Sequence, residues 1–68
     1  MTPTPAAMAA AFSIWHIVRA VNTRQAWGWA HDYMIGAATY ASALGNYADQ
    51  DYFNELAEAA SEIAAECR

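Results

Sequence analysis

Hydrophobic residues recur along the chain at intervals of three and four, which is the spacing of one face of an α-helix. Three segments show this pattern, and short polar or glycine-containing stretches separate them. The pattern predicts helices over residues 5–21, 23–44 and 49–66. Because no segment alternates between apolar and polar residues as a strand does, we expect an all-α fold, a small three-helix bundle.

The ends of the first two predicted helices carry recognisable signals. Thr4 precedes Pro5, so we expect Thr4 to cap the first helix and Pro5 to stand in its first turn, where a missing N–H costs nothing. Asn22 is expected to cap the second helix, since a glutamine follows it at the third position. Gly45 is expected to end that helix, because glycine tolerates the left-handed backbone that follows a helix C-terminus.

The first predicted helix is apolar on two sides. One stripe consists of Ile14, Ile17, Val18 and Val21. The other stripe consists of Met8, Phe12, Trp15 and Arg19, and we expect the arginine to lie over an aromatic ring. A single neighbouring helix cannot cover both stripes.

The second predicted helix has an apolar arc of about 200°, wider than the stripe of about 100° that a surface helix usually shows. The arc consists of Ala26, Ala30, Tyr33, Ala37, Tyr40, Ala41 and Leu44, flanked by Trp27, Trp29, Met34 and Gly36. We therefore expect this helix to be buried on two sides.

These helices have more apolar surface than one small chain can bury. Monomers seldom expose contiguous apolar patches beyond a few hundred Å², so we expect homodimerisation to complete the bundle, with Ala30, Gly36, Ala37 and Ala41 allowing helices to approach closely. The alternative is that a different protein covers the surplus. The candidate residues for either contact are Met8, Phe12, Trp15, Arg19, Trp29, Tyr33, Ile35 and Tyr40.

The third predicted helix, capped by Asn46 or Asp49, has an acidic polar face. Five carboxylates fall on this face at steps of three and four, and we name them the acid stripe: Asp51, Glu55, Glu58, Glu62 and Glu66. Like charges one turn apart each destabilise a helix by a few tenths of a kcal/mol, and no basic residue interleaves with them. The stripe is either a solvated face or a docking surface for a basic groove.

From length and composition we expect one small acidic domain over residues 1–68, with a disordered N-terminus at residues 1–4. Seven acids and three arginines give a net charge of -4, which argues against direct binding of nucleic acid. Eighteen alanines and no lysine are typical of a GC-rich bacterium or its phage. The N-terminal segment lacks the basic residues of a signal peptide and is too short to span a membrane, so we expect no membrane association and a location in the cytoplasm of a bacterial host.

No pattern of residues indicates catalysis. His16 and His31 are not spaced to place two metal ligands on one helical face. His31 and Asp32 are neighbours, whose side chains should diverge on a helix. Cys67 is a lone cysteine among glutamates and lacks the nearby base that activates a thiol. We therefore predict no enzymatic activity, no metal and no cofactor.

In size, acidity and lack of catalytic motifs, the chain resembles in type the small phage-encoded inhibitors of bacterial defence, anti-CRISPR proteins among them. This resemblance rests on no family motif and assigns no residue a role. It implies a non-enzymatic protein-binding module acting by occlusion, which docks on a basic nucleic-acid-binding surface or through an apolar helix face. The alternative is a structural or regulatory helical subunit of a homo- or hetero-oligomeric complex.

Overall fold

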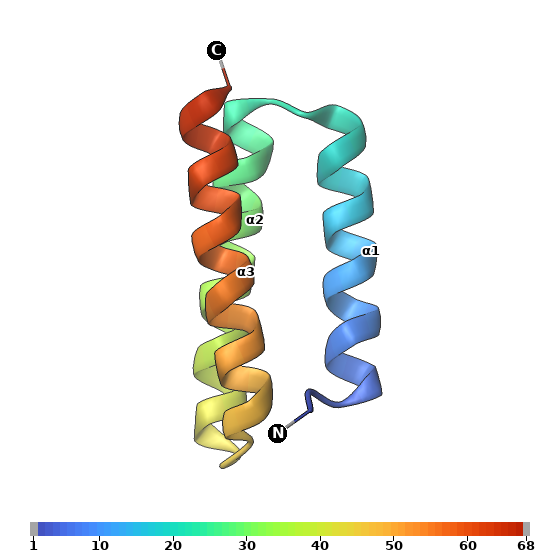
Figure 1. The fold of residues 1–68 in the computed structure, drawn as a ribbon, viewed down its shortest axis with the longest axis vertical. Coiled ribbons are helices and arrows are strands. Elements are labelled where there is room, and N and C mark those ends of the chain that lie inside the picture. The colour runs from blue at the N-terminus through green and yellow to red at the C-terminus, as the bar shows by residue number, and fades with distance from the viewer. Residues whose placement is uncertain (1, 68) are drawn as a thin grey trace.

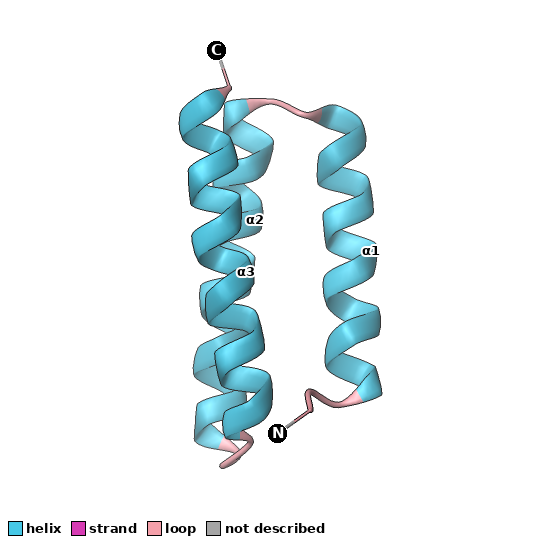
Figure 2. Ribbon diagram, viewed as in Figure 1, coloured by secondary structure: helices cyan, strands magenta, loops and turns pink. Residues whose placement is uncertain are grey.

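A computed structural model describes residues 2–67, which form three helices. They are α1 (Pro5–Val21), α2 (Arg24–Ala43) and α3 (Tyr47–Glu66), and the described residues contain no strand. The three-helix, all-α prediction is confirmed. The bounds of α1 are as predicted, α2 is one residue shorter at each end, and α3 begins two residues earlier. Figures 1 and 2 show α2 and α3 lying side by side, with α1 standing apart from them.

Helix ends follow the predicted chemistry at three places. Thr4 caps α1, and its hydroxyl accepts a hydrogen bond from the Ala7 N–H at 3.2 Å. Gly45 follows α2 with φ of 75°, the left-handed conformation that glycine adopts without steric cost. Of the two candidate caps of α3, Asn46 is the cap, and Asp49 lies within the first turn. Asn46 is therefore the reason that α3 begins at residue 47.

The prediction that Asn22 caps α2 is wrong. Thr23 is the cap, and its hydroxyl accepts from the Ala26 N–H at 3.1 Å. Asn22 instead ends α1 in the left-handed conformation (φ 51°, ψ 52°), which asparagine tolerates better than most residues. Its side-chain oxygen accepts a hydrogen bond from Trp27 Nε1 at 2.9 Å. The two residues of the α1–α2 turn thus divide the capping between them.

Alanines line the contact between α2 and α3. Five of them are almost completely buried and are named here the alanine seam: Ala30, Ala38, Ala41, Ala57 and Ala60. Because methyl side chains fill little space, the backbones of α2 and α3 approach closely along their lengths. Ala30 and Ala41, expected to help a second copy approach, are therefore already used within the chain.

Larger side chains fill the space between α1 and the other two helices. Met34 and Phe53 pack against Ala7 and Ala11 of α1. Trp15 lies edge-on to Trp27, with ring centroids 4.9 Å apart and planes at 70°. Trp15 is thus partly buried in the core. These rings keep the backbone of α1 away from α2 and α3.

Candidate protein-docking face

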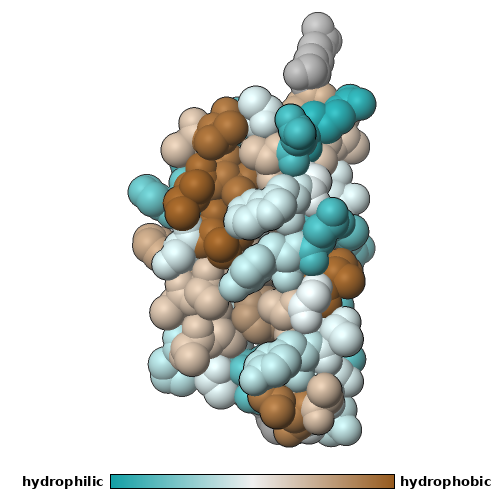
Figure 3. Space-filling model, turned by 180° about the vertical axis from the view of Figure 1, so that it is seen from behind, coloured by the Kyte–Doolittle hydropathy of each residue, from teal (hydrophilic) through white to brown (hydrophobic). Residues whose placement is uncertain are grey.

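Large apolar side chains remain exposed on the flank that α1 and α2 share, on the side away from α3. We name this set the apolar α1–α2 face: Ile17 and Val21 from α1, with Trp29, Tyr33, Tyr40 and Leu44 from α2. Their exposed fractions run from 38% for Tyr33 to 68% for Tyr40. Seen from behind in Figure 3, hydrophobic side chains gather over this face, most densely near the α1–α2 turn.

Helix geometry explains why these residues stay exposed. The buried residues of α1 are Ala7, Ala11 and Val18, which fall on one narrow stripe. Ile17 lies about 100° around the helix from Val18, so it cannot point toward the same neighbours. The sequence predicts that α2 is buried on two sides. In the structure α2 buries the side toward the core. The adjoining side, which carries the α2 residues of the apolar α1–α2 face, stays exposed.

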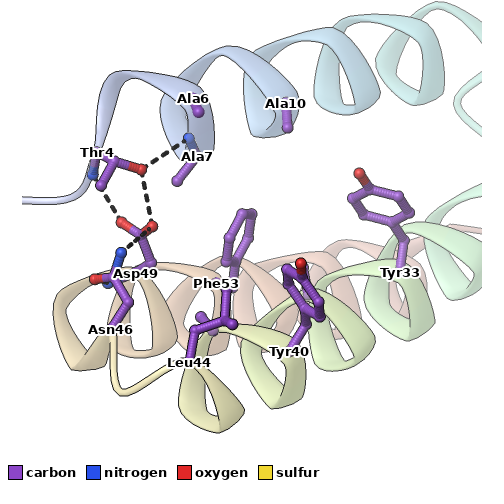
Figure 4. A pocket seen from close by; sticks show the side chains of 12 residues that line it. Thr4, Ala6, Ala7, Ala10, Tyr33, Tyr40, Leu44, Asn46, Asp49 and Phe53 are labelled. Atoms are coloured by element: carbon purple, nitrogen blue, oxygen red, sulfur yellow. Dashed lines mark hydrogen bonds between the residues drawn. The ribbon is translucent and has the colours of Figure 1, made fainter.

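A groove opens within this face at the end of the molecule where α1 begins (Figure 4). Its volume is about 250 Å³. Ala6 and Ala10 form the α1 wall, Tyr33 and Tyr40 rise from α2, and Phe53 lies between them. The groove exists because alanines on α1 stand opposite tyrosines on α2 and leave the space above Phe53 unfilled.

A hydrogen-bond network closes one end of the groove (Figure 4). Asp49 is 7% exposed, and its two carboxylate oxygens accept three hydrogen bonds. The Thr4 N–H donates at 2.7 Å, the Thr4 hydroxyl at 2.8 Å and the Asn46 amide at 2.9 Å. The same Thr4 hydroxyl caps α1, so a single carboxylate of α3 fixes the start of α1. The sequence predicts a disordered segment 1–4, but Thr4 is anchored by these hydrogen bonds. Met1 lies outside the described residues.

Arg24 links the start of α2 to the end of α3 at the opposite end of the molecule. Its Nε and Nη2 atoms donate to the Cys67 carbonyl at 3.2 and 3.0 Å. This carbonyl follows the last turn of α3, where helix carbonyls lack partners within the helix. The Asp49 network thus joins the start of α1 to α3 at one end of the molecule, and the exposed Arg24 contact joins α2 to the end of α3 at the other.

The eight apolar candidates from the sequence do not form one surface. Trp29, Tyr33 and Tyr40 belong to the apolar α1–α2 face, whereas Ile35 is exposed beside a separate α2–α3 groove. Met8, Phe12 and Arg19 lie on the other flank of α1. Phe12 and the core residue Trp15 line a third groove, of about 220 Å³, with Tyr52 and Leu56.

The two rings on the stripe that Arg19 shares, those of Phe12 and Trp15, each pack against another ring. Phe12 stacks on His16, with centroids 6.0 Å apart and planes 11° from parallel. These two residues are four apart on α1 and therefore lie on the same side of the helix. Arg19 is exposed.

All five residues of the acid stripe are exposed, on the side of α3 opposite its buried residues. Within residues 2–67, no hydrogen bond or ion pair involves any of their carboxylates. The stripe and the apolar α1–α2 face therefore lie on opposite sides of the molecule, and one flat partner cannot contact both at once.

One prediction about the histidines is wrong. His31 Nδ1 lies 3.1 Å from Asp32 Oδ1, although adjacent side chains on a helix usually diverge. Asp32 is 82% exposed, so this contact is of the surface kind that adds little stability. Among the described residues, no group of three or more histidine, cysteine, aspartate or glutamate side chains could hold a metal ion.

The comparisons with known proteins assign the chain to no group. No protein-family model, no curated protein and no solved structure matches it. Over residues 2–67, none of the helices is both long enough and apolar enough to cross a membrane.

Sequence reasoning missed Ile17, Val21 and Leu44 as candidates for this face. Helical spacing had placed Ile17 and Val21 on a stripe with the buried Val18. The width of that stripe was the signal that could have identified them. A helix that contacts its neighbours through alanines buries only a narrow part of its surface, so residues at the edge of a wide apolar stripe stay exposed.

Proposed function

We propose that this chain is a non-enzymatic protein-binding module that acts by covering a surface of another protein, and that it docks through the apolar α1–α2 face. The observation that carries the proposal is the exposure of six large apolar side chains on one flank of two helices. Contiguous apolar patches of this kind mark interaction sites in folded proteins. Tyrosine and tryptophan, which form half of the set, are also the residues that dominate binding energy at interfaces.

The groove in this face supports the proposal. The groove has an apolar lining, a mouth flanked by Tyr33 and Tyr40, and a polar end at Asp49. These features suit a partner's side chain that is mostly apolar. The Asp49 network supports it too, because it fixes the start of α1 beside the groove, and a surface that is already ordered pays less entropy on binding.

The acid stripe supports a second docking mode, in which the module occupies a basic, nucleic-acid-binding surface. Its five carboxylates are exposed and point away from the bundle. Attraction of this kind weakens as salt screens the charges, whereas apolar docking does not. The proposal that the module is a phage-encoded inhibitor of bacterial defence, acting in the bacterial cytoplasm, is compatible with either docking mode. The lysine-free composition and the lone cysteine favour that setting.

The test is capture of partners from a bacterial host lysate on the immobilised chain, followed by mass spectrometry. Tyr40→Glu places a charge on the apolar α1–α2 face, at a side chain that is 68% exposed and so is not needed for folding. We expect this variant to lose the partner while its circular dichroism stays helical. Phe12→Glu is the matched control, because Phe12 is 72% exposed on the other flank of α1.

Charge reversal of the acid stripe separates the two docking modes. If Glu58→Lys with Glu62→Lys loses the partner while Tyr40→Glu retains it, the acid stripe is the docking surface. Capture that persists at about 0.5 M salt argues for the apolar mode, since the screening length there is only a few Å. A partner that every variant retains would contradict the proposal.

A second candidate function, that of a helical subunit in an oligomer, is favoured by one observation. Gly36 and Ala37 lie among the aromatic residues of α2 and would let another helix approach the apolar α1–α2 face closely. Gly36 has no neighbouring atom within 4 Å of the position a Cβ would take.

A further inference from the structure

We propose that α1 is a strap that opens as a unit while α2 and α3 stay packed together as a helical hairpin. Opening means that α1 leaves the other two helices in a minor fraction of the molecules and then returns. The opening itself goes beyond the proposed function, and only its effect on docking rests on that function. Three observations carry the inference: how α2 and α3 are joined, how little α1 buries, and what holds the two ends of α1.

The contacts that join α2 to α3 do not need α1. The alanine seam brings the two backbones together along their lengths. Residues 44–46 connect the two helices directly, and Asn46 caps α3. At the other end, Arg24 donates to the Cys67 carbonyl. The hairpin therefore keeps these contacts when α1 leaves.

The contacts of α1 are fewer and depend largely on small side chains. The backbone of α1 approaches those of α2 and α3 at few points (Figure 1). The buried residues of α1 are Ala7, Ala11 and Val18. Its larger core side chains, Ile14 and Trp15, are only partly buried. Because hydrophobic stabilisation scales with the apolar area buried, detaching α1 costs only part of the free energy of unfolding the whole chain.

A hinge at one end of α1 and a latch at the other determine how it can move. The hinge is the turn of Asn22 and Thr23, where Asn22 already has the left-handed conformation. A few such turn residues can absorb the backbone rotations that swing a helix away. The latch consists of the hydrogen bonds of 2.7 and 2.8 Å from Thr4 to Asp49. The start of α1 is thus held to α3 by bonds that can break and re-form.

Opening is coupled to docking, because the apolar α1–α2 face is complete only while α1 is closed. The latch residues Thr4 and Asp49 line the groove of this face. A partner on the face therefore binds the closed state and suppresses opening. Opening removes the α1 wall of the groove and uncovers Met34 and Phe53, which pack against α1.

Native-state hydrogen exchange of the full chain tests the strap. After correction for intrinsic rates, we expect amides at the centre of α1, residues 10–18, to exchange about 10-fold or more faster than those at the centres of α2 and α3. Low concentrations of urea should accelerate exchange in α1 with a smaller slope than in α2 and α3, because opening exposes less surface than global unfolding. Equal protection of the three helices, or exchange in α1 that does not respond to urea, would overturn the inference.

Two matched alanine-to-glycine substitutions separate the strap from the hairpin. Ala38 is 3% exposed in the alanine seam, and Ala11 is 2% exposed on α1. Glycine in a helix costs about 1 kcal/mol relative to alanine, which corresponds to about a fivefold change in exchange. Ala38→Gly weakens a contact that survives opening, so exchange should rise about fivefold or more in α2 and α3 and stay unchanged in α1. Ala11→Gly weakens a contact that opening breaks, so exchange should rise in all three helices.

The same rise in α1 as in α2 and α3 for Ala38→Gly would show that the chain opens only as a whole, and would overturn the inference. If either variant fails to fold, the wild-type measurement decides alone.

The exchange and capture experiments separate the two proposals, because opening is measured on the free chain. Equal protection of the three helices would exclude the strap and leave docking through the apolar α1–α2 face standing. A captured partner that Tyr40→Glu retains, together with faster exchange in α1, would contradict docking through this face and leave the strap standing without its coupling.

Discussion

Replacing Asp49 tests whether one carboxylate fixes α1 to α3. Asp49→Ala removes the acceptor of three hydrogen bonds, made by the Thr4 N–H, the Thr4 hydroxyl and the Asn46 amide. A hydrogen bond to a charged group contributes about 1.5–3 kcal/mol. The three share one acceptor and Thr4 is only half-buried, so water recovers part of the loss and the contributions do not add. We expect Asp49→Ala to lower the free energy of unfolding by about 3 kcal/mol.

Such a loss is a large share of the total, because a chain of this length has a stability of about 3–10 kcal/mol. Urea denaturation followed by circular dichroism at 222 nm measures it. Asp49→Asn retains one acceptor oxygen and should lose about half as much. Should Asp49→Ala fail to fold, Asp49→Asn still gives a measurable midpoint.

A matched control and a double-mutant cycle complete the Asp49 test. Asp51 lies two residues away in the same turn and is exposed, so Asp51→Ala should change stability by less than about 0.5 kcal/mol. Thr4→Ala combined with Asp49→Ala should show a coupling energy of about 1 kcal/mol or more. If Asp49→Ala and Asp51→Ala unfold at the same urea concentration, the network does not hold α1 in place.

Four further substitutions test the turn, the glycines and the core, each by thermal or urea unfolding. Asn22→Ala should cost about 2 kcal/mol, since alanine is strained in the left-handed conformation and Trp27 Nε1 loses its acceptor; an unchanged midpoint would contradict this. Gly36→Ala should stabilise the protein by up to about 1 kcal/mol, because the added methyl group meets no atom. Gly45→Ala should destabilise the protein by about 1 kcal/mol, because Gly45 has a φ of 75°. The opposite signs would be inconsistent with the assigned C-terminus of α2. Met34→Ala should cost about 2–5 kcal/mol as the most deeply buried large side chain, and a loss below 1 kcal/mol would place Met34 outside the core.

The secondary structure was predictable because local chemistry decides it. Thr4 before Pro5 and the lone Gly45 mark helix ends in a way that needs no tertiary contact. Asn22 shows the limit of this reasoning. Asparagine suits both an N-cap and a left-handed C-cap, and the choice between them depends on Trp27, whose indole N–H needs an acceptor once the ring is buried.

The candidate site was less predictable, since it depends on how far apart the helices stand. Periodicity placed Trp15 and Tyr40 in one set of contact residues, yet Trp15 lies in the core and Tyr40 is exposed. The difference arises from how the helices pack: α2 lies close to α3, and Tyr40 is left at the open edge of the groove between α2 and α1. The role of Asp49 was hidden for the same reason, because its partner Thr4 is 45 residues away in the sequence.

The alanine seam also limits how this sequence can change over evolution. Seven of the eighteen alanines are buried, five of them in the seam, so the composition that suggested a GC-rich genome also has a steric cause. A side chain larger than alanine at these positions would push α2 and α3 apart, at a cost of about 1–3 kcal/mol for each overpacked site. Divergent versions of the chain should therefore keep small residues at these five positions while their surfaces drift, and that spacing of small residues is the feature by which distant members could be found.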